Sequence, residues 1–124
     1  MKKSNKISEA ELEIMKLIWE AGAPVASTDI VRRLKSKCGW EDTTIYTMLS
    51  KLVKKGVLIR DKQGVSYYAA ALSEQDYMLE QTESLVNRLF AGDSRQLVSM
   101  LVENRKISRE DIRELRQLWE ADDE

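Results

Sequence analysis

Apolar residues between Trp40 and Gly56 recur at positions i, i+3, i+4 and i+7, the spacing of one face of an α-helix. They are Ile45, Met48, Leu49 and Leu52. The other positions carry mainly hydroxyl and ammonium groups, namely Thr43, Thr44, Tyr46, Thr47, Ser50, Lys51 and Lys54. Hydroxyls can reach base edges and phosphates, and lysines neutralise phosphate charge. The pattern predicts a helix that buries one side in a small core and presents the other side to a polyanion.

Two shorter helices are predicted before this one. Ser8 followed by Glu11 is a capping box, which starts the first helix, and Gly22 ends it as the C-terminal cap. Ser27 is the expected N-cap of the second helix, and Asp42 is the expected N-cap of the third. Helices joined by such short turns, the last of them polar on its exposed side, match the helix-turn-helix plan.

A β-hairpin is predicted after the third helix, which Gly56 ends. Its strands are Val57–Arg60 and Val65–Ala71, and Gly64 supplies the positive φ that a short turn requires. Val25–Ala26 is a candidate third strand. A lone hairpin is only marginally stable, so we expect it to pack on the helices as a wing.

The region 72–124 predicts three more helices. Ser73 caps the first and Ser94 starts the second. Ser108 and Asp111 open the third. These helices carry many large apolar residues, which are the candidate dimerisation residues Leu85, Leu89, Phe90, Leu97, Met100, Leu101, Ile112, Leu115, Leu118 and Trp119. A segment of about 50 residues rarely covers its own core, so we expect two copies to share an all-helical dimer core. The alternative is that the helices pack on the first domain of the same chain.

The predicted fold class is mainly α with a small β wing. An N-terminal winged helix-turn-helix, DNA-binding domain spans 1–71, and a C-terminal helical dimerisation domain spans 72–124. Residues 1–71 hold 13 Lys and Arg against 8 Asp and Glu, whereas residues 72–124 hold 7 against 13. A basic front half with an acidic back half suits an anion-binding module attached to a segment that stays off the anion.

The threonines at the start of the third helix require an explanation. Thr43, Thr44 and Thr47 are poor helix formers, and a merely solvated face would favour Glu, Lys and Gln. Base and phosphate contact by the first turns of a recognition helix supplies a reason. Arg60 and Lys62, beside the hairpin turn, are candidate phosphate contacts. The alternative for these two is charge that protects an edge strand.

Several kinds of chemistry are missing from the sequence. There is no histidine, so the commonest general base and metal ligand is absent, and neither glycine-rich phosphate motif occurs. The single cysteine, Cys38, excludes an internal disulfide and indicates a reducing compartment. No apolar run is long enough to cross a bilayer, and no signal peptide precedes the first helix. The sequence therefore argues against an enzyme, a cofactor, a bound metal and membrane insertion, and favours the cytoplasm.

Three stretches of the chain resemble the penicillinase repressor family (the BlaI/MecI/CopY type) in order and spacing. They are ISEAELEIMKLIWEAG, WEDTTIYTMLSKLVKKGVLIRDKQGVSYYAA, and LSEQDYMLEQTESLVNRLFAGDSRQLVSMLVEN with ISREDIRELRQL. The resemblance extends from Ile7 to about Trp119. It implies a cytoplasmic homodimer that represses transcription by occupying palindromic operator DNA, typically for β-lactam resistance or copper homeostasis. The recognition-helix pattern of the family falls on Thr43, Thr44, Tyr46 and Thr47, although many relatives carry lysine at the position of Thr43.

The resemblance also bears on induction. Copper-responsive members end in a cysteine-rich tail, whereas this chain has only Cys38, which disfavours a metal sensor. In the β-lactam branch a membrane sensor protease triggers a cut at an Asn-Phe bond in the fifth helix, and Met100 and Leu101 stand at the matching positions. Two alternatives to an operator-binding repressor remain open. One is a regulator whose C-terminal helices enclose a small-molecule pocket, and the other is a winged-helix module whose Thr/Lys face docks on an acidic protein.

Overall fold

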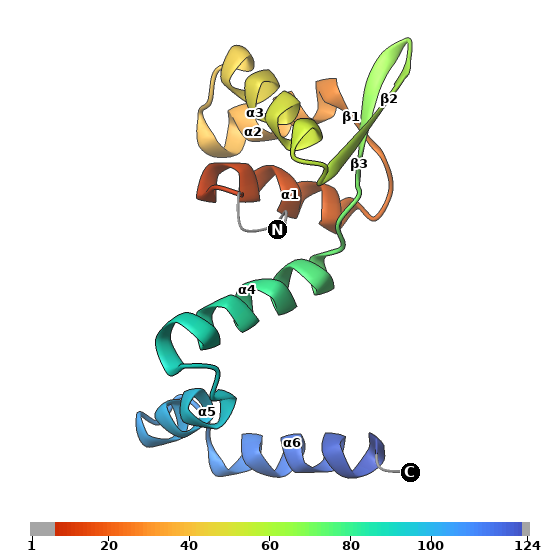
Figure 1. The fold of residues 1–124 in the computed structure, drawn as a ribbon. Helices are drawn as coiled ribbons and strands as arrows, with labels where there is room; N and C mark the ends of the chain where they lie inside the picture. Colours follow the sequence, from red (N-terminus) through yellow and green to blue (C-terminus); the bar gives the residue numbers. More distant parts are fainter. Residues whose placement is uncertain (1–6, 123–124) are drawn as a thin grey trace. The chain divides into compact units, whose positions relative to one another are not determined.

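The computed structural model describes residues 7–122, which form helices and one small antiparallel sheet, as predicted (Figure 1). In chain order the elements are α1 (Glu9–Ala21), β1 (Val25–Ala26), α2 (Ser27–Cys38), α3 (Asp42–Lys54), β2 (Leu58–Gln63), β3 (Val65–Ala70), α4 (Glu74–Phe90), α5 (Ser94–Glu103) and α6 (Arg109–Asp122). The chain divides into two compact units, and the boundary falls inside α4, between Gln81 and Thr82. We call them the first and the second unit.

The start of α4 belongs to the first unit because Trp19 of α1 holds it there. The indole Nε1 of Trp19 donates a hydrogen bond to the Leu72 carbonyl oxygen at 2.8 Å. Its ring also lies against Tyr77, with 5.5 Å between the ring centroids. The boundary between the compact units therefore lies further along the chain than the domain boundary predicted after Ala71.

The first helix begins and ends as its sequence predicts. Ser8 Oγ accepts the Glu11 N–H at 3.1 Å, and Glu11 Oε1 accepts the Ser8 N–H at 2.9 Å, which completes the capping box. Gly22 follows the helix with a φ of 68°, the left-handed conformation that glycine adopts without steric cost.

The caps predicted for α2 and α3 were wrong by one residue. The N-cap of α2 is Ala26 rather than Ser27, because pairing of β1 with β3 holds Ala26 extended immediately before the helix. The N-cap of α3 is Glu41 rather than Asp42. The Asp42 carboxylate instead pairs with Lys35 of α2, with 3.0 Å between Lys35 Nζ and Asp42 Oδ1. Asp42 therefore occupies the first turn of α3, where a negative charge is favoured by the helix dipole.

The sheet has the strand order β1-β3-β2, and both pairings are antiparallel (Figure 1). The predicted third strand is confirmed, since Val25 pairs with Tyr68. The predicted turn was too long, because β2 continues to Gln63 and leaves Gly64, at a φ of 84°, as the reversal point. A glycine at this position lets both strands extend to the tip of the wing.

The core of the first unit is apolar and is supplied by every helix and strand that surrounds it. Its fully buried members are Ile14, Met15, Ile30, Leu34, Ile45, Leu49, Leu52 and Val57. Burying one such side chain stabilises a fold by about 1.5–3 kcal/mol. The core therefore holds α3 on α1 and α2, and it places the predicted apolar face of α3 inward.

The second unit contains few buried residues. Val86 is the buried residue that the structure describes there, and the other large apolar side chains keep much of their exposure. On α6 the exposed fraction is 43% for Ile112, 51% for Leu115, 66% for Leu118 and 73% for Trp119. Leu89 and Met100 are also exposed, at 61% and 49%. The remaining dimerisation candidates, Leu85, Phe90, Leu97 and Leu101, are half-buried.

Candidate nucleic-acid interface

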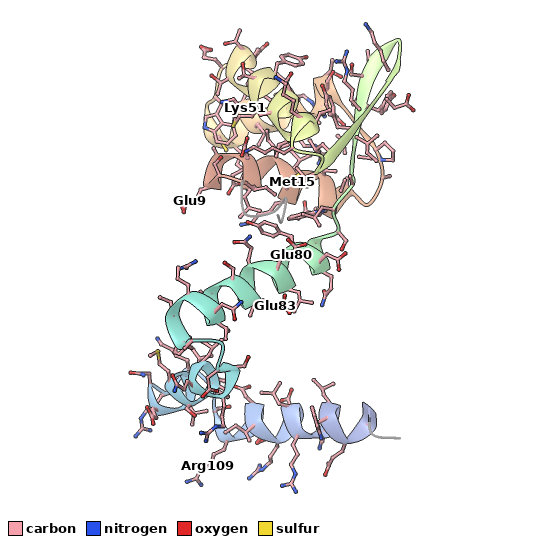
Figure 2. The ribbon with its side chains drawn as sticks, viewed as in Figure 1. Glu9, Met15, Lys51, Glu80, Glu83 and Arg109 are labelled. Carbon is pink, nitrogen blue, oxygen red and sulfur yellow. The ribbon has the colours of Figure 1, made fainter. Side chains whose placement is uncertain are left out.

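The polar face of α3 is exposed along its whole length. Ile45, Leu49 and Leu52 point into the core, and Met48 and Val53 pack against it, so the polar side chains are left toward solvent. The exposed residues include all seven that the sequence singles out: Thr43, Thr44, Tyr46, Thr47, Ser50, Lys51 and Lys54. Figure 2 shows the side chain of Lys51 on α3. A polar helix face of this kind can lie against a polyanion without uncovering the core.

The hydroxyls at the start of α3 differ in their partners. Thr47 Oγ1 donates to the Thr43 carbonyl oxygen at 2.8 Å, one turn earlier in the helix. This bond lets a β-branched residue satisfy its hydroxyl within the helix. Within residues 7–122, the hydroxyls of Thr43 and Thr44 make no such bond. They are therefore available to an external acceptor or donor.

The cations of α2 and α3 are in different electrostatic states. On α2, Lys35 pairs with Asp42, Lys37 pairs with Glu13 at 3.0 Å, and Arg32 pairs with Asp29. A hydrogen bond from each lysine to its carboxylate raises the pKa of Lys35 and of Lys37. These three cations are therefore partly offset by protein carboxylates, whereas Arg33 of the same helix has no ion pair within the described residues.

The lysines of α3 differ from those of α2. In the part of the chain that the structure describes, neither Lys51 nor Lys54 has an ion-pair partner. Their charge is therefore not offset locally, and it can neutralise phosphates.

The register of the wing places its candidate cations on one face. In the antiparallel register of β2 and β3, Arg60 stands opposite Tyr68 and Lys62 stands opposite Ser66. Strand residues two apart share a face, so both cations lie on the face of buried Leu58, which packs toward the helices. Arg60 Nε also donates to Ser66 Oγ at 3.1 Å, which orients the guanidinium. The carboxylate of the wing, Asp61, lies on the opposite face.

Lys55 has a role that the sequence did not reveal. It directly follows Lys54, but its side chain turns inward and pairs with Glu11 of α1, with 2.6 Å between Lys55 Nζ and Glu11 Oε1. Burial raises the pKa of the Glu11 carboxyl, but hydrogen bonds from Lys55 and Ser8 outweigh it and leave the pKa below its usual value. The one available signal was spacing, because adjacent helical residues point about 100° apart and cannot share a face.

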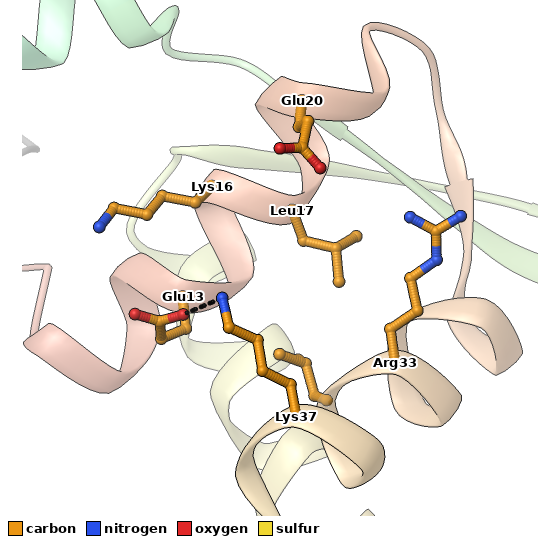
Figure 3. Close-up of a pocket in the computed structure, with 7 residues that line it drawn as sticks. Glu13, Lys16, Leu17, Glu20, Arg33 and Lys37 are labelled. Carbon is orange, nitrogen blue, oxygen red and sulfur yellow. Dashed lines mark hydrogen bonds and ion pairs between the residues drawn. The ribbon is translucent and has the colours of Figure 1, made fainter.

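A hollow of about 260 Å³ lies between α1 and α2 (Figure 3). Its lining residues are Glu13, Lys16, Leu17, Glu20, Arg33, Leu34 and Lys37. The Lys37–Glu13 pair crosses it, and none of the lining residues belongs to α3 or to the wing. The hollow is therefore separate from the candidate interface.

A helix-turn-helix followed by a hairpin wing defines the winged-helix class of DNA-binding proteins. The solution structure of the Bacillus licheniformis BlaI monomeric form in complex with the blaP half-operator has this fold. It matches with a TM-score of 0.53 and 41% identity, over 62% of this chain and 94% of that chain. The predicted fold class is thereby confirmed.

Two relatives match over nearly their whole length. The penicillinase repressor of Bacillus licheniformis is 38% identical over 97% of this chain and 94% of its own. The methicillin resistance regulatory protein MecI of Staphylococcus aureus (strain N315) is 30% identical over 94% of each chain. The family profile described as penicillinase repressor matches residues 7–121. The chain belongs to the penicillinase repressor family.

Membership of this family confirms the predicted resemblance and the predicted repressor role. It also confirms that the protein is a regulator of transcription and not an enzyme. Of the two alternatives, the acidic-protein docking module loses its support. None of the helices in residues 7–122 combines the length and apolar character needed to cross a bilayer.

Proposed function

We propose that the protein is a cytoplasmic repressor that binds palindromic operator DNA as a homodimer, with α3 in the major groove and the wing beside it. The observation that carries this proposal is that Lys51 and Lys54 stand unpaired, within residues 7–122, on the exposed polar face of α3, whereas Arg32, Lys35 and Lys37 of α2 pair with carboxylates. Cations that pair with protein carboxylates have less of their charge available to phosphate. Lys51 and Lys54 are unpaired within the described residues. Their position on one face with Thr43 and Thr44 supplies phosphate contact and base contact together.

Each residue group has a separate part in this proposal. Lys51, Lys54, Arg60 and Lys62 neutralise phosphates and set the position of the protein on the duplex. Thr43, Thr44, Tyr46, Thr47 and Ser50 face the bases and the adjoining backbone, where hydroxyls donate and accept hydrogen bonds. Hydroxyl contacts are adaptable, so the sequence preference arises from several of them acting together.

The second unit supplies the dimer. Its exposed apolar residues on α4, α5 and α6 need a cover, and an identical segment of a second chain presents a matching surface. A homodimer also turns the second half-site contact into an intramolecular event, which raises the operator affinity without any new contact. The two-fold axis of such a dimer accounts for a palindromic operator.

The names of the relatives support a proposal for the regulated genes. The names of the Bacillus and Staphylococcus relatives refer to penicillinase and to methicillin resistance, and both relatives cover nearly the full length of this chain. We therefore assign control of β-lactam resistance to this repressor, with a membrane sensor protease as its upstream partner.

Inactivation by a cut between Met100 and Leu101 is part of this proposal. The carbonyl oxygen of Met100 accepts hydrogen bonds from Asn104 N at 3.0 Å and from Asn104 Nδ2 at 2.8 Å. The Leu101 carbonyl oxygen accepts from Lys106 N at 2.8 Å. A protease binds its substrate extended, so the end of α5 has to unwind before the bond can be cut. Mass spectrometry of the chain from cells exposed to a β-lactam should show a fragment ending at Met100, and an intact chain after induction would contradict this route.

The operator proposal is tested by selecting duplexes from a random pool with the full chain and measuring affinity by fluorescence anisotropy. We expect a palindromic consensus. If the dimer makes about 6–10 phosphate contacts, its affinity should fall about 10³–10⁵-fold between about 50 and 200 mM salt. The proposal would be overturned if the chain binds no duplex at low salt. It would also be overturned if the chain sediments as a monomer at the same concentration.

The ligand-sensing alternative has one observation in its favour. A hollow of about 460 Å³ lies where α5 meets α6, beside Ile107 and Ile112. A small molecule bound there should raise the melting temperature of the free repressor and lower its operator affinity. Melting temperatures that stay constant across a panel of cell-wall fragments and β-lactams would leave this alternative without support.

A further inference from the structure

Glu11 of α1 and Lys55 at the end of α3 form an ion pair inside the first unit. Their side chains keep only 5% and 23% of their exposure, and the atoms Lys55 Nζ and Glu11 Oε1 lie 2.6 Å apart. The same Glu11 oxygen accepts the Ser8 N–H at 2.9 Å. The pair therefore joins the capping box of α1 to the residue that closes α3, across 44 positions of sequence.

The two helices also share buried apolar residues. Ile14 and Met15 of α1 and Ile45 and Leu49 of α3 are fully buried in one core. Apolar burial has no preferred direction, so it fixes the position of α3 along its axis less sharply than a bond between two particular atoms. A buried ion pair is directional, although its desolvation cost leaves it little net contribution to stability.

The other end of α3 is held more weakly. Asp42 pairs with Lys35 of α2, but these side chains keep 54% and 53% of their exposure, so water and salt screen the pair. The buried pair at Lys55 is therefore the firmer of the two constraints on the axial position of α3.

We infer that Glu11 and Lys55 are positioning residues for operator recognition, because their part-buried ion pair helps to fix which base edges the hydroxyls of α3 reach. The inference rests on the proposed function. Binding groups have to be held within about 0.5 Å of their productive positions, so a small axial shift of α3 disturbs base contacts. Phosphate contacts by flexible lysines tolerate such a shift. The loss of the pair should therefore reduce discrimination between sequences more than it reduces general DNA affinity.

The test compares Lys55→Met with Lys54→Met, its exposed neighbour. Affinity is measured for the selected palindromic duplex and for a random duplex over a range of salt. Lys55→Met should lower the ratio of the two affinities about tenfold, comparable to the removal of one base interaction, with an unchanged salt slope. Lys54→Met should weaken both duplexes alike and reduce the slope by about 0.9 for each phosphate that the protein no longer neutralises. Lys55→Arg, which keeps the charge, should retain the ratio.

Glu11→Gln provides a second variant, since the amide oxygen still accepts the Ser8 N–H while the charge is removed. It should lower the ratio of the two affinities as Lys55→Met does. If Lys55→Met does not fold, as judged by cooperative unfolding, Glu11→Gln alone tests the inference. A wild-type ratio in the folded variant overturns the inference. So does a reduced salt slope for Lys55→Met, which would place Lys55 on phosphate. If the wild-type chain selects no sequence at all, the proposed function fails, irrespective of Lys55.

Discussion

Lys35 of α2 lies beside Asp42 of α3, with 3.0 Å between Lys35 Nζ and Asp42 Oδ1. The pair crosses the turn of the helix-turn-helix and neutralises the carboxylate at the start of the helix that we place in the major groove. Without Lys35, this carboxylate would stand next to phosphate. If α3 binds the operator as proposed, we expect Lys35 to assist binding without contacting DNA.

The Lys35→Ala variant should weaken binding to every duplex by about 1.4- to 5-fold at low salt, because an exposed pair is worth about 0.2–1 kcal/mol. The deficit should shrink as salt rises and screens the repulsion. Anisotropy titrations at several salt concentrations measure it. Lys37→Ala is the matched control, since Lys37 pairs with Glu13 of α1 and should have a smaller effect. Equal effects of the two variants would contradict this account.

If the chain dimerises as proposed, the Leu118→Asp variant should convert the dimer to monomers and reduce operator affinity. Leu118 on α6 is 66% exposed in the single chain, so a charge there should leave the fold intact while it disrupts an apolar interface. Sedimentation velocity and circular dichroism measure the two properties. Gln117→Asp, one residue earlier on the same exposed helix, is the control. A dimeric Leu118→Asp protein would show that α6 lies outside the interface.

The Leu49→Ala variant should lower the free energy of unfolding by about 2–5 kcal/mol, because the substitution leaves a cavity in a fully buried position of α3. Tyr46→Ala, on the exposed side of the same helix, should change it by about 0.5 kcal/mol or less. Urea denaturation followed by circular dichroism measures both. Similar losses for the two variants would mean that α3 packs differently.

The Glu11 carboxyl should make stability depend on acid pH. Its pKa is lowered in the folded protein, because hydrogen bonds from Lys55 and Ser8 outweigh the effect of burial. A lowered folded pKa contributes stability above the ordinary value of 4.5, and this contribution is lost as the pH falls through the folded pKa. The difference in unfolding free energy between wild type and Glu11→Gln should therefore shrink below about pH 4.5. Glu20→Gln, which removes an exposed carboxylate, should show a smaller change.

Local signals in the sequence predict the elements of the fold well. The Ser8–Glu11 capping box, the positive φ at Gly64 and the apolar spacing from Ile45 to Leu52 all act over a few residues, and the structure confirms each. The boundaries are less predictable. The local pattern favours Asp42 as an N-cap, but a residue of another helix draws its carboxylate away, and no local pattern records that competition.

Long-range pairing could not be predicted from the sequence. The Lys55–Glu11 contact spans 44 positions, and the surrounding Lys54-Lys55-Gly56 pattern is what any helix C-terminus favours. The exposure of Thr43 and Lys54 was predictable, because helical periodicity assigns their face. Which of the many cations are already neutralised by carboxylates required the three-dimensional positions of Glu13, Asp29 and Asp42.

Trp119 on α6 keeps 73% of its surface in water in the single chain, so its fluorescence can report whether two chains associate as proposed. Indole emission shifts to shorter wavelength when the ring leaves water. Trp19 and Trp40 are already partly covered by the core of the first unit, so dilution should change the emission of Trp119 most. With phenylalanine in place of Trp40, which leaves the Trp19 hydrogen bond intact, a dissociation constant for the proposed dimer can be measured by intrinsic fluorescence without dye or DNA.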